Sequence, residues 1–216
     1  MAETHATYGF QFASAAHQEE VSIAGMWLFL ASEVLFFGAL FLAWIFARYF
    51  NEAGFNAAAL ETSLVIGTIN TITLLASSLA FALGVMFIRA GNTRRLIQCC
   101  IVVMALGALF MVLKFAVEWR DDFARNLFPG PDFAVQGPLR GGAQLFFTFY
   151  FFATGVHGLH MLAGLAVVAW IVRRAYRGDF SERYHTPIVV VGLYWSFVDI
   201  VWLILFPLIY LIGGAR

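Results

Sequence analysis

Five long apolar runs are the feature of this sequence that most restricts its fold. They cover Ser22–Ala47, Leu64–Ile88, Leu96–Val117, Ala143–Val172 and Ile188–Ile212. Each has at least the roughly 20 residues that an α-helix needs to cross the hydrocarbon core of a bilayer. They are too long for the alternating strands of about 9–11 residues that build membrane barrels, and only internally hydrogen-bonded backbone is stable in lipid. The sequence therefore predicts an all-α integral membrane bundle of five transmembrane helices.

The composition excludes several other classes of protein. The 216 residues are 62% hydrophobic and 12% charged, whereas a soluble domain has about 45–50% apolar and about 25% charged residues. The net charge is zero, so there is no basic footprint for binding nucleic acid. The two cysteines, Cys99 and Cys100, are adjacent and offer neither a disulfide framework nor a cysteine-built metal site.

The chain reads as a single domain over residues 1–216. Residues 1–21 form an N-terminal arm that lacks Lys, Arg and an apolar core, so it does not resemble a cleavable signal peptide. Residues 22–212 hold the five transmembrane helices. The connection from Arg120 to Gly142 contains three prolines and four glycines, which predicts an irregular but tied-down loop.

The arginines indicate how the bundle lies in the membrane. Seven of them occur in the connections that share a side with the N-terminus, and five occur on the other side. Because basic residues favour the cytoplasmic side, we predict a cytoplasmic N-terminus and an external C-terminus.

Four ionisable side chains fall near one level of the predicted membrane. Counted along the helices, Glu33, His157, His160 and Asp199 lie roughly 16–23 Å from the inner boundary. A charge that faced lipid there would cost several kcal/mol, so these groups should point into the bundle and toward one another. Ser196, three residues before Asp199, is placed to donate a hydrogen bond to it. Interhelical hydrogen bonding, proton handling and, less favoured because a third ligand is missing, metal binding all fit this spacing.

Lys114 and Glu118 are four residues apart near the outer end of the third run, a spacing typical of an ion pair on a helix. Their position predicts a snorkelling pair at the outer interface. Pro207 should bend the last helix. No nucleophile with an adjacent base and no phosphate-binding glycine loop occurs, so we predict no catalytic, cofactor-binding or metal-binding residues in this chain.

Five motifs carry a resemblance to a known family. They are MWLFLASEVLFFGALF at 26–41, INTITLLASS at 69–78, GNTRR at 91–95, FFATGVHGLHMLAG at 151–164 and YWSFVDIVWLILF at 194–206. Together and in this order they resemble the cytochrome c oxidase subunit III family of the haem-copper oxidases, in a five-helix form.

The resemblance implies a subunit without haem or copper of its own, because those cofactors belong to partner subunits I and II. It implies packing against subunit I, support of proton uptake and contact with membrane phospholipid, with no small-molecule substrate. Glu33 falls on the family's buried glutamate, and Asp199 on its last-helix aspartate. His157 and His160 fall on its paired histidines, and Glu118 on its outer-end glutamate.

The sequence departs from the family pattern in two ways. Full-length members have seven helices, and the first two, which form one wall of a lipid-filled cleft, have no counterpart among the five runs. Either a partner subunit supplies that wall of the cleft, or the cleft is open here. Ser196 stands where the family usually has histidine, so Asp199 must find its partner on another helix or stay protonated.

Three other functions compete with a cytochrome c oxidase subunit. Two are relatives within the family, namely subunit III of a quinol oxidase and a homologue associated with nitric oxide reductase. The third is a small proton-coupled secondary transporter, disfavoured because no broken span and no inverted repeat is visible. The expected location is the inner (plasma) membrane of a bacterium, in preference to the mitochondrial inner membrane.

Overall fold

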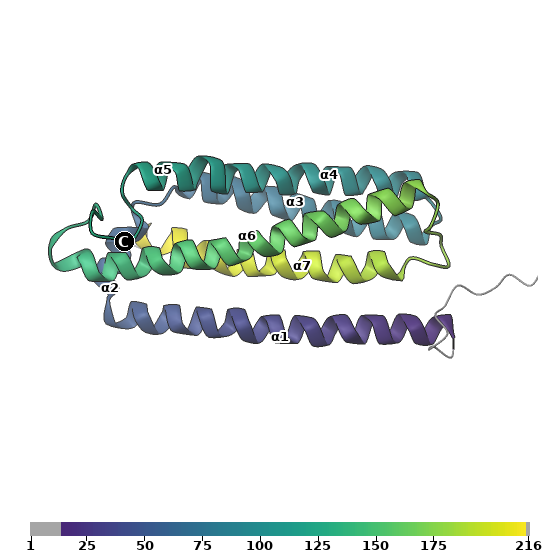
Figure 1. The fold of residues 1–216 in the computed structure, drawn as a ribbon, viewed down its shortest axis with the longest axis horizontal. Helices are drawn as coiled ribbons and strands as arrows, with labels where there is room; N and C mark the ends of the chain where they lie inside the picture. Colours follow the sequence, from purple (N-terminus) through teal and green to yellow (C-terminus); the bar gives the residue numbers. More distant parts are fainter. Residues whose placement is uncertain (1–13, 215–216) are drawn as a thin grey trace, which may run out of the picture.

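A computed structural model describes residues 14–214, and its elements are helices (Figure 1). Seven α-helices are joined by short π- and 3₁₀-helical segments. In chain order the elements are α1 Ala15–Phe50, α2 Glu52–Ala59, α3 Leu64–Arg89, α4 Thr93–Met111, the π-helix η1 Val112–Glu118, α5 Trp119–Ala124, the 3₁₀-helix η2 Gly137–Leu139, α6 Arg140–Tyr176, α7 Thr186–Phe206, the π-helix η3 Pro207–Leu211 and the 3₁₀-helix η4 Ile212–Gly214.

The predicted five membrane spans are confirmed at the level of length and hydropathy. Five helical stretches are long and apolar enough to cross a bilayer, and the third of them runs without interruption through α4, η1 and α5. The helices extend beyond the apolar runs, since α1 begins at Ala15 and α6 covers 37 residues. Most of the predicted N-terminal arm, residues 1–13, lies outside the described residues.

Local sequence signals explain where several helices begin. The hydroxyl of Ser63 accepts the backbone N–H of Ile66 at the start of α3, and the Asn92 side chain accepts that of Arg95 at the start of α4. Such caps satisfy N–H groups that have no partner within the helix. Gly91, at φ +74°, makes the tight turn between α3 and α4.

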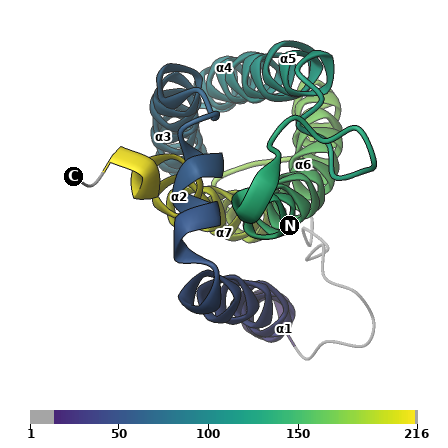
Figure 2. The same cartoon turned by 90° about the vertical axis from the view of Figure 1, so that its left-hand side faces the viewer.

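Helices α3, α4, α6 and α7 form a four-helix unit, and α1 lies on its outside against α6 and α7 (Figure 2). In the unit's core, Trp195 of α7 lies against Gly107 of α4 and Gly164 of α6. A Cβ atom at Gly107 or Gly164 would come within 3.1 Å of the indole. These two glycines therefore let three helices meet around one large aromatic ring.

One end of the bundle, here called the α2 end, is more ordered than the sequence predicted. Helix continues through Ala124 and resumes at Arg140, so the expected irregular loop is shortened to the residues between them, with one 3₁₀ turn. The loop is held by Arg140, which donates to the Pro131 carbonyl at 2.6 Å, and by Gln144, which donates to the Gly130 carbonyl at 2.9 Å. Helix α2 was not predicted, because its eight residues are too few for a span.

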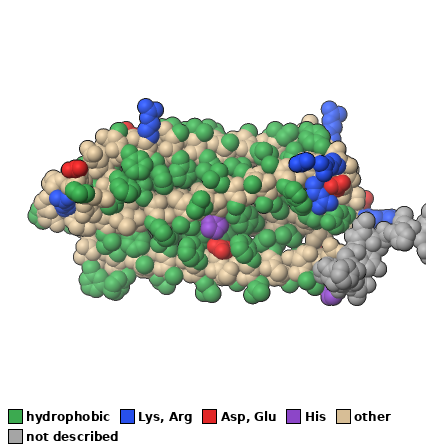
Figure 3. All heavy atoms as spheres, in the orientation of Figure 1, with side chains coloured by type: hydrophobic (Ala, Val, Ile, Leu, Met, Phe, Trp, Pro, Cys, Tyr) green, Lys and Arg blue, Asp and Glu red, His purple; other side chains and the backbone are tan. Residues whose placement is uncertain are grey.

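The surface divides into an apolar belt and two polar ends (Figure 3). Hydrophobic side chains cover the length of the visible face, and Lys, Arg, Asp and Glu gather mainly near the ends. Many large apolar residues of α1 are exposed, including Leu28 at 76% and Leu35 at 75%. This distribution is the one expected of a bundle whose sides face hydrocarbon.

Candidate functional site

Glu33 and His160 join α1 to α6 midway along the bundle. The Glu33 Oε2 atom lies 3.1 Å from His160 Nε2, and both side chains are about four-fifths buried. Figure 3 shows a histidine and an acidic side chain side by side in the seam between α1 and the rest of the molecule. The ring of Phe37 packs edge-on against His160, with centroids 5.3 Å apart.

The hydrogen bonds of His160 restrict where the protons of this pair can be. His160 Nδ1 lies 2.9 Å from the Val156 carbonyl oxygen, which can only accept, so Nδ1 carries a proton. The bond to Glu33 then requires either a protonated Nε2 facing a carboxylate or a protonated Glu33 donating to a neutral imidazole. The pair therefore shares one proton across the α1–α6 seam.

Asp199 has its hydrogen-bond partner on another helix, one of the two expectations that followed from the family's missing histidine, and not in Ser196. Its Oδ2 accepts a hydrogen bond from the hydroxyl of Ser78 on α3, and Asp199 is only 4% exposed. Ser196, the predicted donor, is exposed and faces away from this site. The prediction for Ser196 is therefore corrected: residues three apart on α7 point about 60° apart, which is enough to separate a buried face from an exposed one.

His157 is enclosed by aromatic rings. It is 1% exposed, and its ring lies 5.4 Å from Phe110 and 5.2 Å from Trp202, centroid to centroid. Neither ring nitrogen has a hydrogen-bond partner within residues 14–214. This histidine consequently contacts neither Glu33 nor Asp199.

The expected single network is thus divided into three places. Glu33 and His160 lie between α1 and α6, Asp199 lies between α7 and α3, and His157 lies inside the four-helix unit. Counting residues along the helices predicted a shared level for these groups, but depth does not determine which neighbouring helix a side chain faces. Rotation around the helix axis separates the groups.

Lys114 and Glu118 form a contact, with Nζ and Oε2 3.1 Å apart, yet the pair does not snorkel. Lys114 is fully buried and Glu118 is 3% exposed, so the prediction that their side chains snorkel to the surface is wrong. The reason is that the helix continues past the apolar run to Ala124, which places both residues inside the bundle. There the Lys114 ammonium also donates to the hydroxyls of Tyr150, at 2.9 Å, and Tyr210, at 2.8 Å.

Sequence reasoning missed the other members of this group. Tyr150 donates to Asp122 Oδ2 at 2.6 Å, and Tyr210 donates to Glu118 Oε1 at 2.7 Å. Asp122, 1% exposed, falls in the connection from Arg120 to Gly142 that was predicted from its prolines and glycines to be an irregular loop. Its spacing of four from Glu118 and eight from Lys114 was the available signal. We call these five residues, Lys114, Glu118, Asp122, Tyr150 and Tyr210, the Lys114 cluster.

Both π-helical segments contribute to the Lys114 cluster. Lys114 and Glu118 lie in η1, and Tyr210 lies in η3. At the end of η1 the Trp119 N–H donates to the Lys114 carbonyl, five residues back. Such wide turns are rare and are frequent at functional sites. Pro207 begins η3, and because proline has no N–H it cannot donate the helical bond expected at that position.

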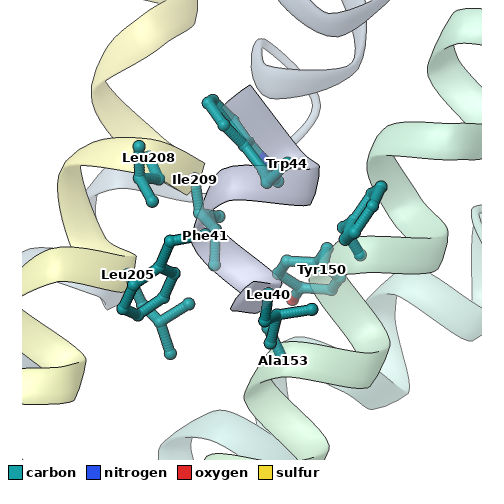
Figure 4. A pocket seen from close by; sticks show the side chains of 9 residues that line it. Leu40, Phe41, Trp44, Tyr150, Ala153, Leu205, Leu208 and Ile209 are labelled. Carbon is teal, nitrogen blue, oxygen red and sulfur yellow. The ribbon is translucent and has the colours of Figure 1, made fainter. Parts of the chain in front are cut away.

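An apolar pocket lies between α1, α6, α7 and η3, and it shares Tyr150 with the Lys114 cluster (Figure 4). Apart from the Tyr150 hydroxyl and the Trp44 indole N–H, its lining side chains offer no polar group that could orient a substrate. Within residues 14–214, no group of three or more His, Cys, Asp or Glu side chains is placed to hold a metal ion. The pocket is lined by Leu40, Phe41, Trp44, Phe149, Tyr150, Ala153, Leu205, Leu208 and Ile209.

The family profile described as cytochrome c oxidase subunit III matches residues 8–214, nearly the whole sequence. This chain belongs to that family. Among curated relatives it is 29% identical over 205 residues to cytochrome c oxidase subunit 3 of Thermostichus vulcanus, covering 91% of this chain and 90% of that protein. It is 27% identical to quinol oxidase subunit 3 of Bacillus spizizenii, covering 97% of each.

A third relative joins two subunits in one polypeptide. The haem-copper oxidase subunit I+III of Aeropyrum pernix is 28% identical over 195 residues, which is 88% of this chain. The chain spans only 22% of the length of that fused protein. Subunit III members from cytochrome c and quinol oxidases thus match this sequence about equally well.

The two serines near Asp199 give a matched test of the site. We expect Ser78→Ala to lower the free energy of unfolding by about 1–3 kcal/mol, because a buried carboxyl group loses its hydrogen-bond donor. Ser196→Ala should stay within about 0.5 kcal/mol of the wild type, because its side chain is exposed. Thermal unfolding of both variants in the same detergent would check this. Equal effects would contradict the assignment of Ser78 as the partner.

Proposed function

We propose that this chain is the non-catalytic subunit III of a cytochrome c oxidase, a haem-copper terminal oxidase of aerobic respiratory electron transport. It stabilises subunit I and supports proton uptake. The observation that carries the proposal is the match of residues 8–214 to the subunit III family. Haem and copper, and the reduction of oxygen, are assigned to the partner subunits I and II. The proposed location is the plasma membrane of a bacterium, with the N-terminus inside.

Direct contact with subunit I is supported by the fused relative, whose name places subunits I and III in one polypeptide. The wide apolar surface of α1 is compatible with a neighbouring membrane subunit, with lipid, or with both. The division of the mid-membrane acids suggests separate roles. The Glu33–His160 pair in the α1–α6 seam is the candidate for proton handling, and Asp199–Ser78 fastens α7 to α3.

A quinol oxidase is the second candidate, favoured by the match to the Bacillus spizizenii protein over 97% of both chains. The cytochrome c donor and the quinol donor are distinguished by assay. The chain should be tagged, extracted in mild detergent and purified with its partners, whose haem and copper are then measured optically and by metal analysis. Oxidation of reduced cytochrome c supports the proposal, and oxidation of a quinol alone supports the alternative. A chain that purifies alone and binds a solute would overturn both in favour of a transporter.

The role in proton uptake leads to a prediction for Glu33. We expect Glu33→Ala to leave initial oxygen reduction largely intact, but to weaken proton delivery and cause activity loss during prolonged turnover. The reason is that His160 loses the carboxyl group with which it shares a proton. Oxygen consumption and proton release in vesicles measure both effects. An Ala variant that matches the wild type through extended turnover and detergent challenge refutes this role.

A further inference from the structure

The hydrogen bonds of the Lys114 cluster can be counted donor by donor. The Lys114 ammonium donates to the hydroxyls of Tyr150 and Tyr210 and lies 3.1 Å from Glu118 Oε2 in an ion pair. The proton of Tyr210 goes to Glu118 Oε1. Tyr150 also has a single proton, and it lies within reach of two carboxyl groups: Asp122 at 2.6 Å and Glu118 at 3.1 Å. It can serve only one of them at a time.

This competition gives the cluster two arrangements that differ mainly in proton positions. In the first, Tyr150 donates to an ionised Asp122. In the second, an added proton sits on Asp122, which donates to the Tyr150 oxygen, while Tyr150 turns its own proton toward Glu118. Passing that proton on would protonate Glu118 and return Asp122 to the carboxylate form. No heavy atom needs to move far, because all the distances are already those of hydrogen bonds.

Among the described residues, the hydrogen bonds of the cluster reach the solvent-exposed surface at the α2 end, through Arg125. Asp122 Oδ1 accepts from Arg125 Nη2 at 2.9 Å, and the Arg125 side chain is 38% exposed. Arg125 also binds the exposed side chains of Asp121 and Glu61, at 2.9 and 3.3 Å. These three are therefore the charged groups that face the cluster from solvent.

On the other side of Lys114, the cluster ends in aromatic rings. Lys114 Nζ lies 5.8 Å from the ring of Trp202, which packs on Phe110 and His157. Within residues 14–214, no hydrogen bond joins the cluster to Trp202, whose indole N–H donates instead to Thr71 Oγ1 at 3.1 Å. The hydrogen bonds among the described residues therefore connect the cluster to solvent at the α2 end and to no second exit.

The charges also fit a site that gains and loses one proton. Within the cluster, the one positive charge of Lys114 faces the two carboxyl groups of Glu118 and Asp122, so the fully ionised cluster has one negative charge in excess, and Arg125 pairs with Asp122 from outside it. No other charged side chain within hydrogen-bond distance contacts Glu118 from α3, α6 or η3; only the Tyr150 and Tyr210 hydroxyls do. One added proton on either carboxyl group leaves one positive and one negative charge in the cluster, and buried charges persist only when paired in this way.

We infer that the Lys114 cluster is a proton-exchange site, in which Asp122 and Glu118 take up and release one proton with the aqueous phase at the α2 end through Arg125 and Tyr150. It is separate from the Glu33–His160 pair, which lies midway along α1 and α6. In the proposed orientation the α2 end is the external side of the membrane. The cluster therefore serves as a dead-end proton store that responds to external pH.

Infrared difference spectroscopy tests the inference on the purified oxidase complex in vesicles. Changing the pH on the α2 side should produce a C=O stretching band of a protonated carboxyl group, and the band should shift in D₂O. The band should be lost in Glu118→Gln or in Asp122→Asn. It should persist in Glu52→Gln, a matched control, because Glu52 is an exposed carboxylate at the same end of the bundle.

Each result has a defined meaning. A band that survives in both Glu118→Gln and Asp122→Asn, or the absence of any pH-dependent band in the wild type, overturns the inference. If either variant fails to assemble, Tyr150→Phe provides the second test: the phenol ring stays, and exchange with D₂O should slow because the relay hydroxyl is gone. Unchanged exchange in Tyr150→Phe also overturns it. A complex without haem or copper would instead contradict the proposed function, and that is seen before any infrared measurement.

Discussion

Replacing Lys114 with methionine should lower the free energy of unfolding by about 3–5 kcal/mol, because removing one partner of a buried ion pair leaves an uncompensated charge. Methionine keeps most of the side-chain length, so the loss is mainly electrostatic. Glu118 loses its cation, and the hydroxyls of Tyr150 and Tyr210 lose a shared donor. Thermal unfolding of the purified complex, together with retention of this chain, measures the effect.

A double variant separates the charge from the shape of the site. Lys114→Met combined with Glu118→Leu removes both charges of the pair, and replacing a buried pair by apolar groups is often close to neutral. We therefore expect the double variant to recover part of the stability lost in Lys114→Met. A single variant as stable as the wild type, or a double variant less stable than the single, would contradict the buried pairing.

Gly54→Ala should detach α2 from α6. A Cβ atom at Gly54 would lie 2.7 Å from the Cα atom of Gly142 and 2.9 Å from its carbonyl carbon. These are backbone atoms, so no side-chain rotation can relieve the clash and the two helices must separate. Overpacking of this kind costs about 1–3 kcal/mol. Hydrogen exchange of the α2 amides should accelerate as a result.

Gly38→Ala is the matched control for this substitution. Gly38 also lies in a helix, but a Cβ atom there would meet nothing within 4 Å. Because alanine is a better helix former than glycine by about 1 kcal/mol, Gly38→Ala should be neutral or slightly stabilising. Equal protection of the α2 amides in Gly54→Ala and the wild type would show that α2 is not seated against Gly142.

The spans could be predicted because each depends only on its own composition. A run such as Leu64–Ile88 is apolar along its whole length, and its partition into lipid does not depend on what it packs against. The length of the irregular loop was overestimated because the structure of its ends depends on contacts with other helices. Asp122 reads as a loop residue until Tyr150 and Arg125, both unpredictable as its partners, supply the bonds that bury it.

The pairing of polar groups could not be predicted from the same information. Depth along a helix follows from counting residues, and it placed Glu33 and His160 at one level. The direction in which a side chain points around its helix can be predicted only when the neighbouring helices are known. Asp199 illustrates this, because its partner is Ser78 on α3 and not Ser196 on its own helix. Lys114 and Glu118 were paired correctly from their spacing, but their burial depended on how far the helix continued beyond the apolar run.

The bond between Glu33 and His160 joins residues 127 positions apart, which has a consequence for biosynthesis. At a synthesis rate of about 5–20 residues per second, the ribosome adds His160 roughly 6–25 s after Glu33. The first helix is therefore complete while its acidic group still has no imidazole to meet. Until α6 follows it into the bilayer, a chaperone, the channel wall or water must accommodate that group.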